Sequence, residues 1–128
     1  MLSNTQIGRA AEFLVCYTLQ LNGIECYHVN STTDVIATVA SGKLLRVEVK
    51  SATTPTLRKN DNAYRFHISK TDNADWYALV ALDTGLMIFM SRTQVKTRDV
   101  RARTITIRAS RFTAELQADT IQKLGAET

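Results

Sequence analysis

The stretch DVIATVASGKLLRVEVKSA, residues 34–52, constrains the fold more than any other part of the sequence. Apolar residues recur at every second position in both halves, which is typical of strands with one buried face, and the Ser-Gly pair between them predicts a turn. A three-residue loop at that turn pairs residues whose numbers sum to 82, so Asp34 lies opposite Glu48. Lys50, two residues further on, points the same way because strand side chains alternate. The hairpin therefore gathers two carboxylates and a lysine on one face and leaves the other face for the core.

The ends of the sequence predict helices. Ser3 and Gln6 form a capping box before a helical apolar pattern that stops at an Asn-Gly pair, so a helix is expected at about residues 4–22. Ser110 is expected to cap a closing helix. Further strand patterns lie between the ends, at residues 25–29, YRFHIS, WYALVAL, LMIFMS and, within a basic stretch, residues 103–108.

WYALVAL is apolar at every position and predicts a strand buried on both faces. With the helices and the other strands it predicts an α+β fold with three layers, in which a mixed central β-sheet is flanked by helices. At 128 residues, the chain is expected to form a single domain spanning residues 1–128.

The sequence also limits where the protein works. It has no secretory signal and no run near the roughly 20 apolar residues that a membrane span needs, so we expect a soluble protein with no membrane partner. The expected location is the cytoplasm, or the host-cell cytoplasm if the chain is viral. Cys16 and Cys26 have no spacing typical of a zinc site, and we expect both to be buried, reduced thiols.

Positive charge is concentrated between residues 92 and 111. This segment carries a net charge of +6, whereas the rest of the chain carries −2. Such a cluster suits a polyanion, because basic side chains that neutralise phosphates release counterions; the alternative is a solvated basic segment without a partner. The candidate DNA-binding residues are Arg92, Lys96, Arg98, Arg101, Arg103, Arg108 and Arg111.

The charged face of the hairpin suggests metal chemistry. Two carboxylates on adjacent strands repel each other unless a cation lies between them, and oxygen ligands of this kind suit Mg²⁺, with Mn²⁺ as a substitute. Lys50 beside them could orient a water molecule and offset charge on a phosphate under attack. The alternative is a cross-strand salt bridge between Lys50 and its neighbours, worth about 0.2–1 kcal/mol.

A resemblance to a known family extends these observations. Asp34, the Glu48-Val49-Lys50 tripeptide and Gly8-Arg9-Ala10-Ala11-Glu12 on the first helix resemble the PD-(D/E)XK nuclease superfamily. The order of helix and hairpin is similar to that of archaeal-type Holliday junction resolvases. The hairpin, and more loosely DWYALVALDTG, is similar to small homing-type endonucleases of the superfamily. The resemblance covers roughly residues 5–90 and does not extend to the C-terminal third, which includes the basic segment.

The resemblance implies a restriction-endonuclease-like core and a role for each matching residue. Asp34 and Glu48 would be metal ligands, joined by the backbone carbonyl of Val49, and Lys50 would be the catalytic lysine. Glu12 would be an outer or second-metal acid, although its place at the edge of the apolar stripe of the helix also fits a surface glutamate. Residue 33, the one before Asp34, is threonine where the family motif has proline.

The function expected from the sequence is a divalent-metal-dependent endonuclease that hydrolyses DNA phosphodiesters. Structure-selective cleavage, similar to Holliday junction resolution in DNA recombination, is the leading interpretation, with a homodimer presenting two sites to branched or duplex DNA. One alternative is a sequence-specific restriction or homing-type endonuclease. Others are a non-catalytic nucleic-acid-binding module and a protein-interaction module whose basic segment meets an acidic partner.

Overall fold

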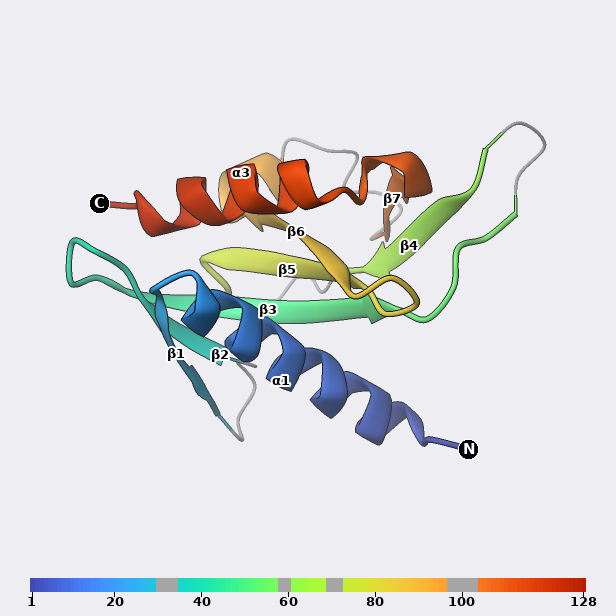
Figure 1. Ribbon diagram of the computed structural model, residues 1–128, viewed down its shortest axis with the longest axis horizontal. Helices are drawn as coiled ribbons and strands as arrows, with labels where there is room; N and C mark the ends of the chain where they lie inside the picture. The colour runs from blue at the N-terminus through green and yellow to red at the C-terminus, as the bar shows by residue number, and fades with distance from the viewer. Residues whose placement is uncertain (30–34, 58–60, 69–72, 97–103) are drawn as a thin grey trace.

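A computed structural model describes residues 1–29, 35–57, 61–68, 73–96 and 104–128. In chain order, the elements are α1 (Asn4–Leu21), β1 (Glu25–His28), β2 (Val35–Thr38), β3 (Leu44–Ala52), β4 (Ala63–His67), β5 (Trp76–Ala81), β6 (Leu86–Ser91), α2 (Arg92–Lys96), β7 (Thr104–Arg108), the 3-10 helix η2 (Ala109–Arg111) and α3 (Ala114–Gly125) (Figure 1).

Five strands form the central sheet, in the order β1-β2-β3-β5-β6. Strands β3 and β5 run parallel, whereas the other neighbours in this sheet are antiparallel. β4 does not join them but pairs with β7 in a separate antiparallel ribbon. The predicted mixed sheet is therefore confirmed, and β4 and β7 form an addition to it.

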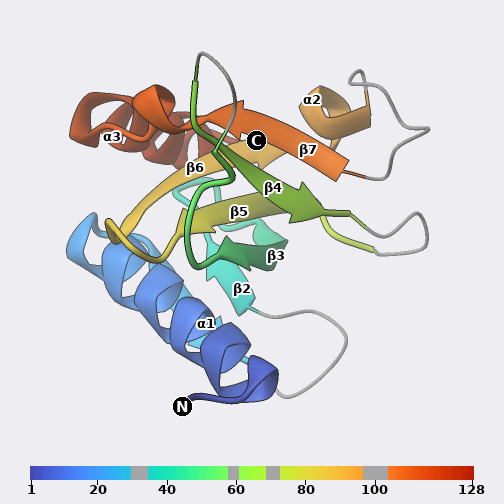
Figure 2. The same ribbon diagram turned by 90° about the vertical axis from the view of Figure 1, so that its right-hand side faces the viewer.

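Apolar clusters cover both faces of the central sheet. On one face, Val15 and Leu19 of α1 and Leu124 of α3 pack against the sheet. On the other, residues of the β4–β7 ribbon and Val95 of α2 pack against Leu79 and its neighbours. Figure 2 shows α1 and α3 on one side of the molecule and α2 toward the other. These three layers confirm the predicted fold class.

The hairpin of β2 and β3 has the predicted register. Val35 faces Val47 and Ala37 faces Leu45, pairs whose numbers sum to 82. The three-residue loop is closed by the Val39 N–H, which donates to the Lys43 carbonyl at 3.1 Å. Gly42 in this loop has φ +88°, a conformation that glycine adopts at little cost. Local chemistry thus sets the pairing that positions Glu48 and Lys50.

Helix α1 also begins as predicted, whereas the C-terminal prediction was wrong in detail. Ser3 Oγ accepts the Gln6 N–H, and Gln6 Oε1 accepts the Ser3 N–H, which completes the capping box. The closing helix is capped by Thr113, whose hydroxyl accepts the Leu116 N–H at 3.1 Å. Ser110 lies instead in η2, because the chain makes a 3-10 turn directly after β7.

The sequence pattern also missed α2, whose five residues are too short to show a helical period. Among the helices in the described ranges, none is long and apolar enough to cross a membrane.

Candidate active site on strand β3

Strand β3 extends beyond the described residues of β2. The described pairing with β2 reaches Val47, whereas the pairing with β5 continues to Ala52. Glu48 and Lys50 lie in this extension, which pairs with β5. Both side chains are therefore held on a strand whose backbone is paired within the central sheet.

The extension has one apolar and one charged face. Val49 packs into the cluster beneath α1. Glu48 and Lys50 point the other way and stand beside Tyr77 and Leu79 of β5, which belong to the cluster under the β4–β7 ribbon. The charged pair thus shares the ribbon side of the sheet, as the alternation in the sequence predicts.

Glu48 and Lys50 contact each other within this face. Glu48 is 9% exposed, and its Oε1 lies 3.4 Å from Nζ of Lys50, whose side chain is 29% exposed. A buried carboxylate is costly without compensating charge or hydrogen bonds, and Lys50 supplies positive charge. Lys50 thus forms an ion pair with Glu48 on its own strand, whereas the alternative interpretation expected a pair across strands. Lys50 is the more exposed member of this ion pair, so its ammonium group is accessible to a substrate.

Asp34 falls within residues 30–34, outside the described ranges, so its place opposite Glu48 stays a prediction. The metal-binding role of the Val49 carbonyl also stays a prediction. Within the ranges described above, no group of three or more His, Cys, Asp or Glu side chains is arranged to hold a metal ion. The Glu48 carboxylate is nevertheless a type of ligand that Mg²⁺ prefers, and it lies at a partly enclosed position beside a lysine.

Glu12 projects from α1 and contacts a histidine that the sequence did not connect to it. Its Oε1 pairs with Nε2 of His28 on β1, and the imidazole stacks on Phe13 with ring centroids 4.9 Å apart. His28 is in register with Val35, whose side chain lies in the cluster beneath α1, so this contact is on the helix side of the sheet. The predicted role of Glu12 as an outer or second-metal acid stays a prediction.

The two cysteines lie at the same interface of α1 and β1. Their Sγ atoms are 2.8 Å apart, and both are free thiols, Cys26 buried and Cys16 partly buried. The hydrogen bond between the two thiols lowers the pKa of Cys16. The same hydrogen bond, together with burial, raises the pKa of Cys26. Both cysteines are therefore free thiols as expected, but Cys26 alone of the two is buried.

The predicted DNA-binding residues fall in different places. Arg98, Arg101 and Arg103 belong to residues 97–103, outside the described ranges. Arg92 Nη1 donates to the Ala74 carbonyl at 2.9 Å, and Arg108 Nε lies 3.2 Å from Asp61 Oδ2. Lys96 ends α2 and Arg111 ends η2, both exposed. The Arg92 guanidinium is therefore partly engaged in a hydrogen bond within the fold, whereas the side chains of Arg108, Lys96 and Arg111 are exposed at the surface.

Two further basic residues lie on the ribbon side of the molecule and were missing from the sequence-based set. Arg46 is exposed and precedes Glu48 by two residues on β3, so it projects from the same face. Arg65 is exposed on β4, outside the basic segment. Alternation along each strand was the signal that could have identified them, once the strand faces were assigned.

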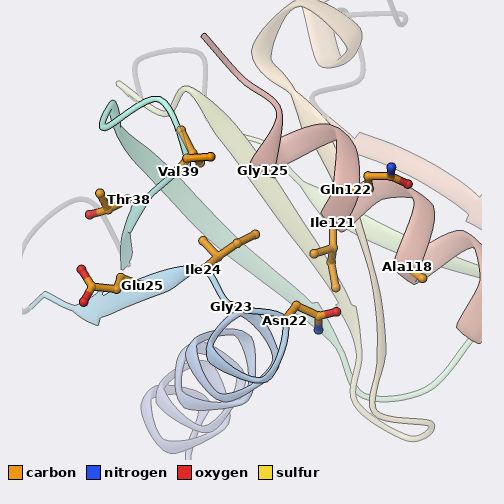
Figure 3. Close-up of a pocket in the computed structure, with 11 residues that line it drawn as sticks. Asn22, Gly23, Ile24, Glu25, Thr38, Val39, Ala118, Ile121, Gln122 and Gly125 are labelled. Carbon is orange, nitrogen blue, oxygen red and sulfur yellow. The ribbon is translucent and has the colours of Figure 1, made fainter.

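A cavity of about 470 Å³ lies elsewhere, between the end of α1 and α3 (Figure 3). Ile24 and Ile121 contribute apolar walls, and Glu25 is the charged residue among its lining residues. Because the lining provides a carboxylate and no Lys or Arg, the cavity does not suit a phosphate.

No protein-family model matches this chain, and no curated protein matches it. Among solved structures, it resembles a bacterial homing endonuclease, I-Ssp6803I, with a TM-score of 0.65 and 18% sequence identity. The match covers 84% of this chain and 76% of that chain. At this low identity the likeness establishes the fold alone. The chain is thus similar in fold to a bacterial homing endonuclease.

Proposed function

We propose that this chain is a divalent-metal-dependent DNA endonuclease of the PD-(D/E)XK kind. The observation that carries the proposal is the Glu48–Lys50 pair on the part of β3 that runs parallel to β5, in a fold similar to that of a homing endonuclease. A carboxylate and a lysine two residues apart on such a strand match the motif that the sequence resembles.

Each residue has a distinct task in this proposal. Glu48, with Asp34 and the Val49 carbonyl, would hold Mg²⁺ or Mn²⁺, which when bound polarises a phosphate oxygen and lowers the pKa of water. Lys50 Nζ is partly exposed, so it can hydrogen-bond to the attacking water or to a phosphate oxygen and offset the charge that develops there. Glu12 is paired with His28 on the helix side of the sheet, whereas Glu48 and Lys50 lie on the ribbon side, so a role for Glu12 as an outer acid depends on the Glu12→Gln test.

The preferred substrate is duplex DNA cut at a specific site. The likeness to a homing endonuclease supports this choice, whereas Holliday junction resolution rests on the order of helix and hairpin in the sequence. A homodimer would place one active site at each strand of the duplex. Structure-selective cleavage of a four-way junction remains the second candidate to be tested beside it.

The deciding experiment is a cleavage assay with purified protein on plasmid and genomic duplex, a four-way junction and single-stranded DNA, with Mg²⁺ or with EDTA. Lys50→Ala is the test variant. Lys43→Ala is the matched control, because Lys43 lies at the hairpin turn and its Nζ donates to the Thr128 carbonyl at 3.4 Å.

Cutting of duplex at discrete positions that requires both Mg²⁺ and Lys50 would support the homing-type proposal. Cutting confined to the junction would support the resolvase interpretation. Binding without cleavage of any substrate would identify a non-catalytic module and overturn the proposal.

A further inference from the structure

The β4–β7 ribbon is firmly attached to the central sheet through one of its faces. Phe66 and Ile107 are buried against the sheet residues on the ribbon side. Phe112 braces them, since its ring lies 4.8 Å from that of Tyr64, edge to face, and 6.1 Å from that of Phe66. Aromatic packing of this kind resists displacement, so the other face of the ribbon is presented in a defined orientation.

That other face is built from polar side chains. Arg65 and His67 of β4 are exposed, and they stand beside Thr106 and Thr104 of β7, which are half-buried. Arg108 continues the row toward the end of β7. Each of these side chains can hydrogen-bond to a base edge or to a phosphate.

The charge of this face is positive. Within the described ranges, Arg65 has no carboxylate partner, whereas Arg108 is paired with Asp61 at a position where the arginine side chain is 76% exposed. Pairs this exposed are weak, so a phosphate could displace Asp61. The ribbon therefore offers fixed hydrogen-bond donors and little negative charge.

The ribbon also stands on the side of the sheet that carries Glu48 and Lys50. β4 follows β3 in the chain and contacts it, and Figure 2 shows β4 and β7 running side by side over this part of the molecule. A duplex with a phosphate at Lys50 would therefore pass close to the ribbon.

We propose that the outer face of the β4–β7 ribbon enters the major groove of duplex DNA and reads base edges next to the cleaved phosphate, with Arg65 and His67 as specificity-determining residues. The major groove of B-form DNA accepts a two-stranded ribbon, and arginine pairs with the O6 and N7 atoms of guanine. The deep, narrow major groove of an RNA duplex excludes such a ribbon, so the partner is DNA. The inference rests on the proposed function and adds the surface that selects the sequence.

The test is selection of bound sequences from a randomised duplex library in EDTA, where binding is measured without cleavage. The variants are Arg65→Ala, His67→Ala and the double substitution. Arg9→Ala is the control, an exposed arginine on α1, which covers the opposite face of the sheet. The substituted side chains are exposed, so melting temperatures should stay within about 2 °C of the wild-type value.

Wild-type protein and Arg9→Ala should enrich the same sequence. The ribbon variants should lose the preference at one or more base pairs, with on the order of 10- to 100-fold weaker binding to the selected site and a few-fold change on unselected duplex. A wild-type protein that enriches no sequence, or ribbon variants that enrich the wild-type sequence, would overturn the ribbon's role even if the enzyme cuts DNA. Failure to bind or cut any DNA would instead overturn the proposed function.

Discussion

Glu48 Oε1 lies 3.4 Å from Lys50 Nζ, two residues further along the same strand. The carboxylate is buried and the lysine is partly exposed, so the two groups are suited to different tasks. An enclosed carboxylate is suited to a fixed cation, whereas an accessible ammonium group is suited to a passing substrate.

Substitutions at these two positions should therefore affect cleavage in different ways. Lys50→Ala should lower the rate by about 10²–10³-fold without changing the Mg²⁺ concentration that gives half-maximal activity, because the lysine stabilises reacting groups. Glu48→Gln should raise that Mg²⁺ concentration, because it removes a charged ligand. Metal titrations of the cleavage rate provide the measurement, and identical midpoints in wild type and Glu48→Gln would contradict the assigned ligand role.

Glu12 and His28 provide a test of whether the helical acid is catalytic. Glu12→Gln keeps a hydrogen-bonding group beside His28, so it should leave the free energy of unfolding within about 1 kcal/mol of the wild-type value. It should nevertheless slow cleavage by at least about tenfold if the carboxylate acts on the metal. His28→Ala should destabilise the protein by about 1–2 kcal/mol through the lost contacts with Glu12 and Phe13. Full activity of Glu12→Gln would assign Glu12 to packing alone.

Tyr64 should contribute a pH dependence to stability. Its hydroxyl donates to Asp83 Oδ1 at 2.7 Å, and burial followed by this hydrogen bond raises the pKa of Tyr64 to about 12 from 10.0. Between pH 10 and pH 12, the unfolded chain loses the proton while the folded protein keeps it, so the contribution present below pH 10 is lost as the pH rises.

Tyr64→Phe should therefore be less stable than wild type by about 1 kcal/mol at pH 8. The free energy of unfolding of the variant should also fall less steeply between pH 10 and pH 12. Urea denaturation across this range compares the two proteins, and parallel profiles would show that Tyr64 does not titrate differently on folding.

The proposed role of the basic segment in DNA binding can be tested at Arg98, Arg101 and Arg103, which lie outside the described ranges. Replacing all three with alanine should weaken binding to every duplex alike and reduce the slope of log affinity against log salt by up to about one unit per lost contact. Filter binding on selected and unselected duplexes measures both effects. An unchanged slope would remove these arginines from the DNA interface, whereas a loss of sequence preference would assign them to base recognition.

Local sequence patterns were sufficient to predict those features of the fold that depend on residues close together in the chain. The capping box at Ser3 and Gln6 and the three-residue turn before Lys43 involve groups close in the chain, so the sequence predicted both correctly. The closing helix shows the limit of such reasoning. Ser110 and Thr113 are both suitable caps, and the turn after β7 decides that Thr113 is used.

The sequence by itself determined that Glu48 and Lys50 share one face of a strand, because side chains alternate along any extended chain. Only the tertiary structure decided which layer covers that face. The β4–β7 ribbon is formed by strands far apart in the sequence, and the Glu12–His28 contact joins a helix to an edge strand. Pairings at such separations depend on how the whole core packs, and alternation within one segment carries no information about the partner.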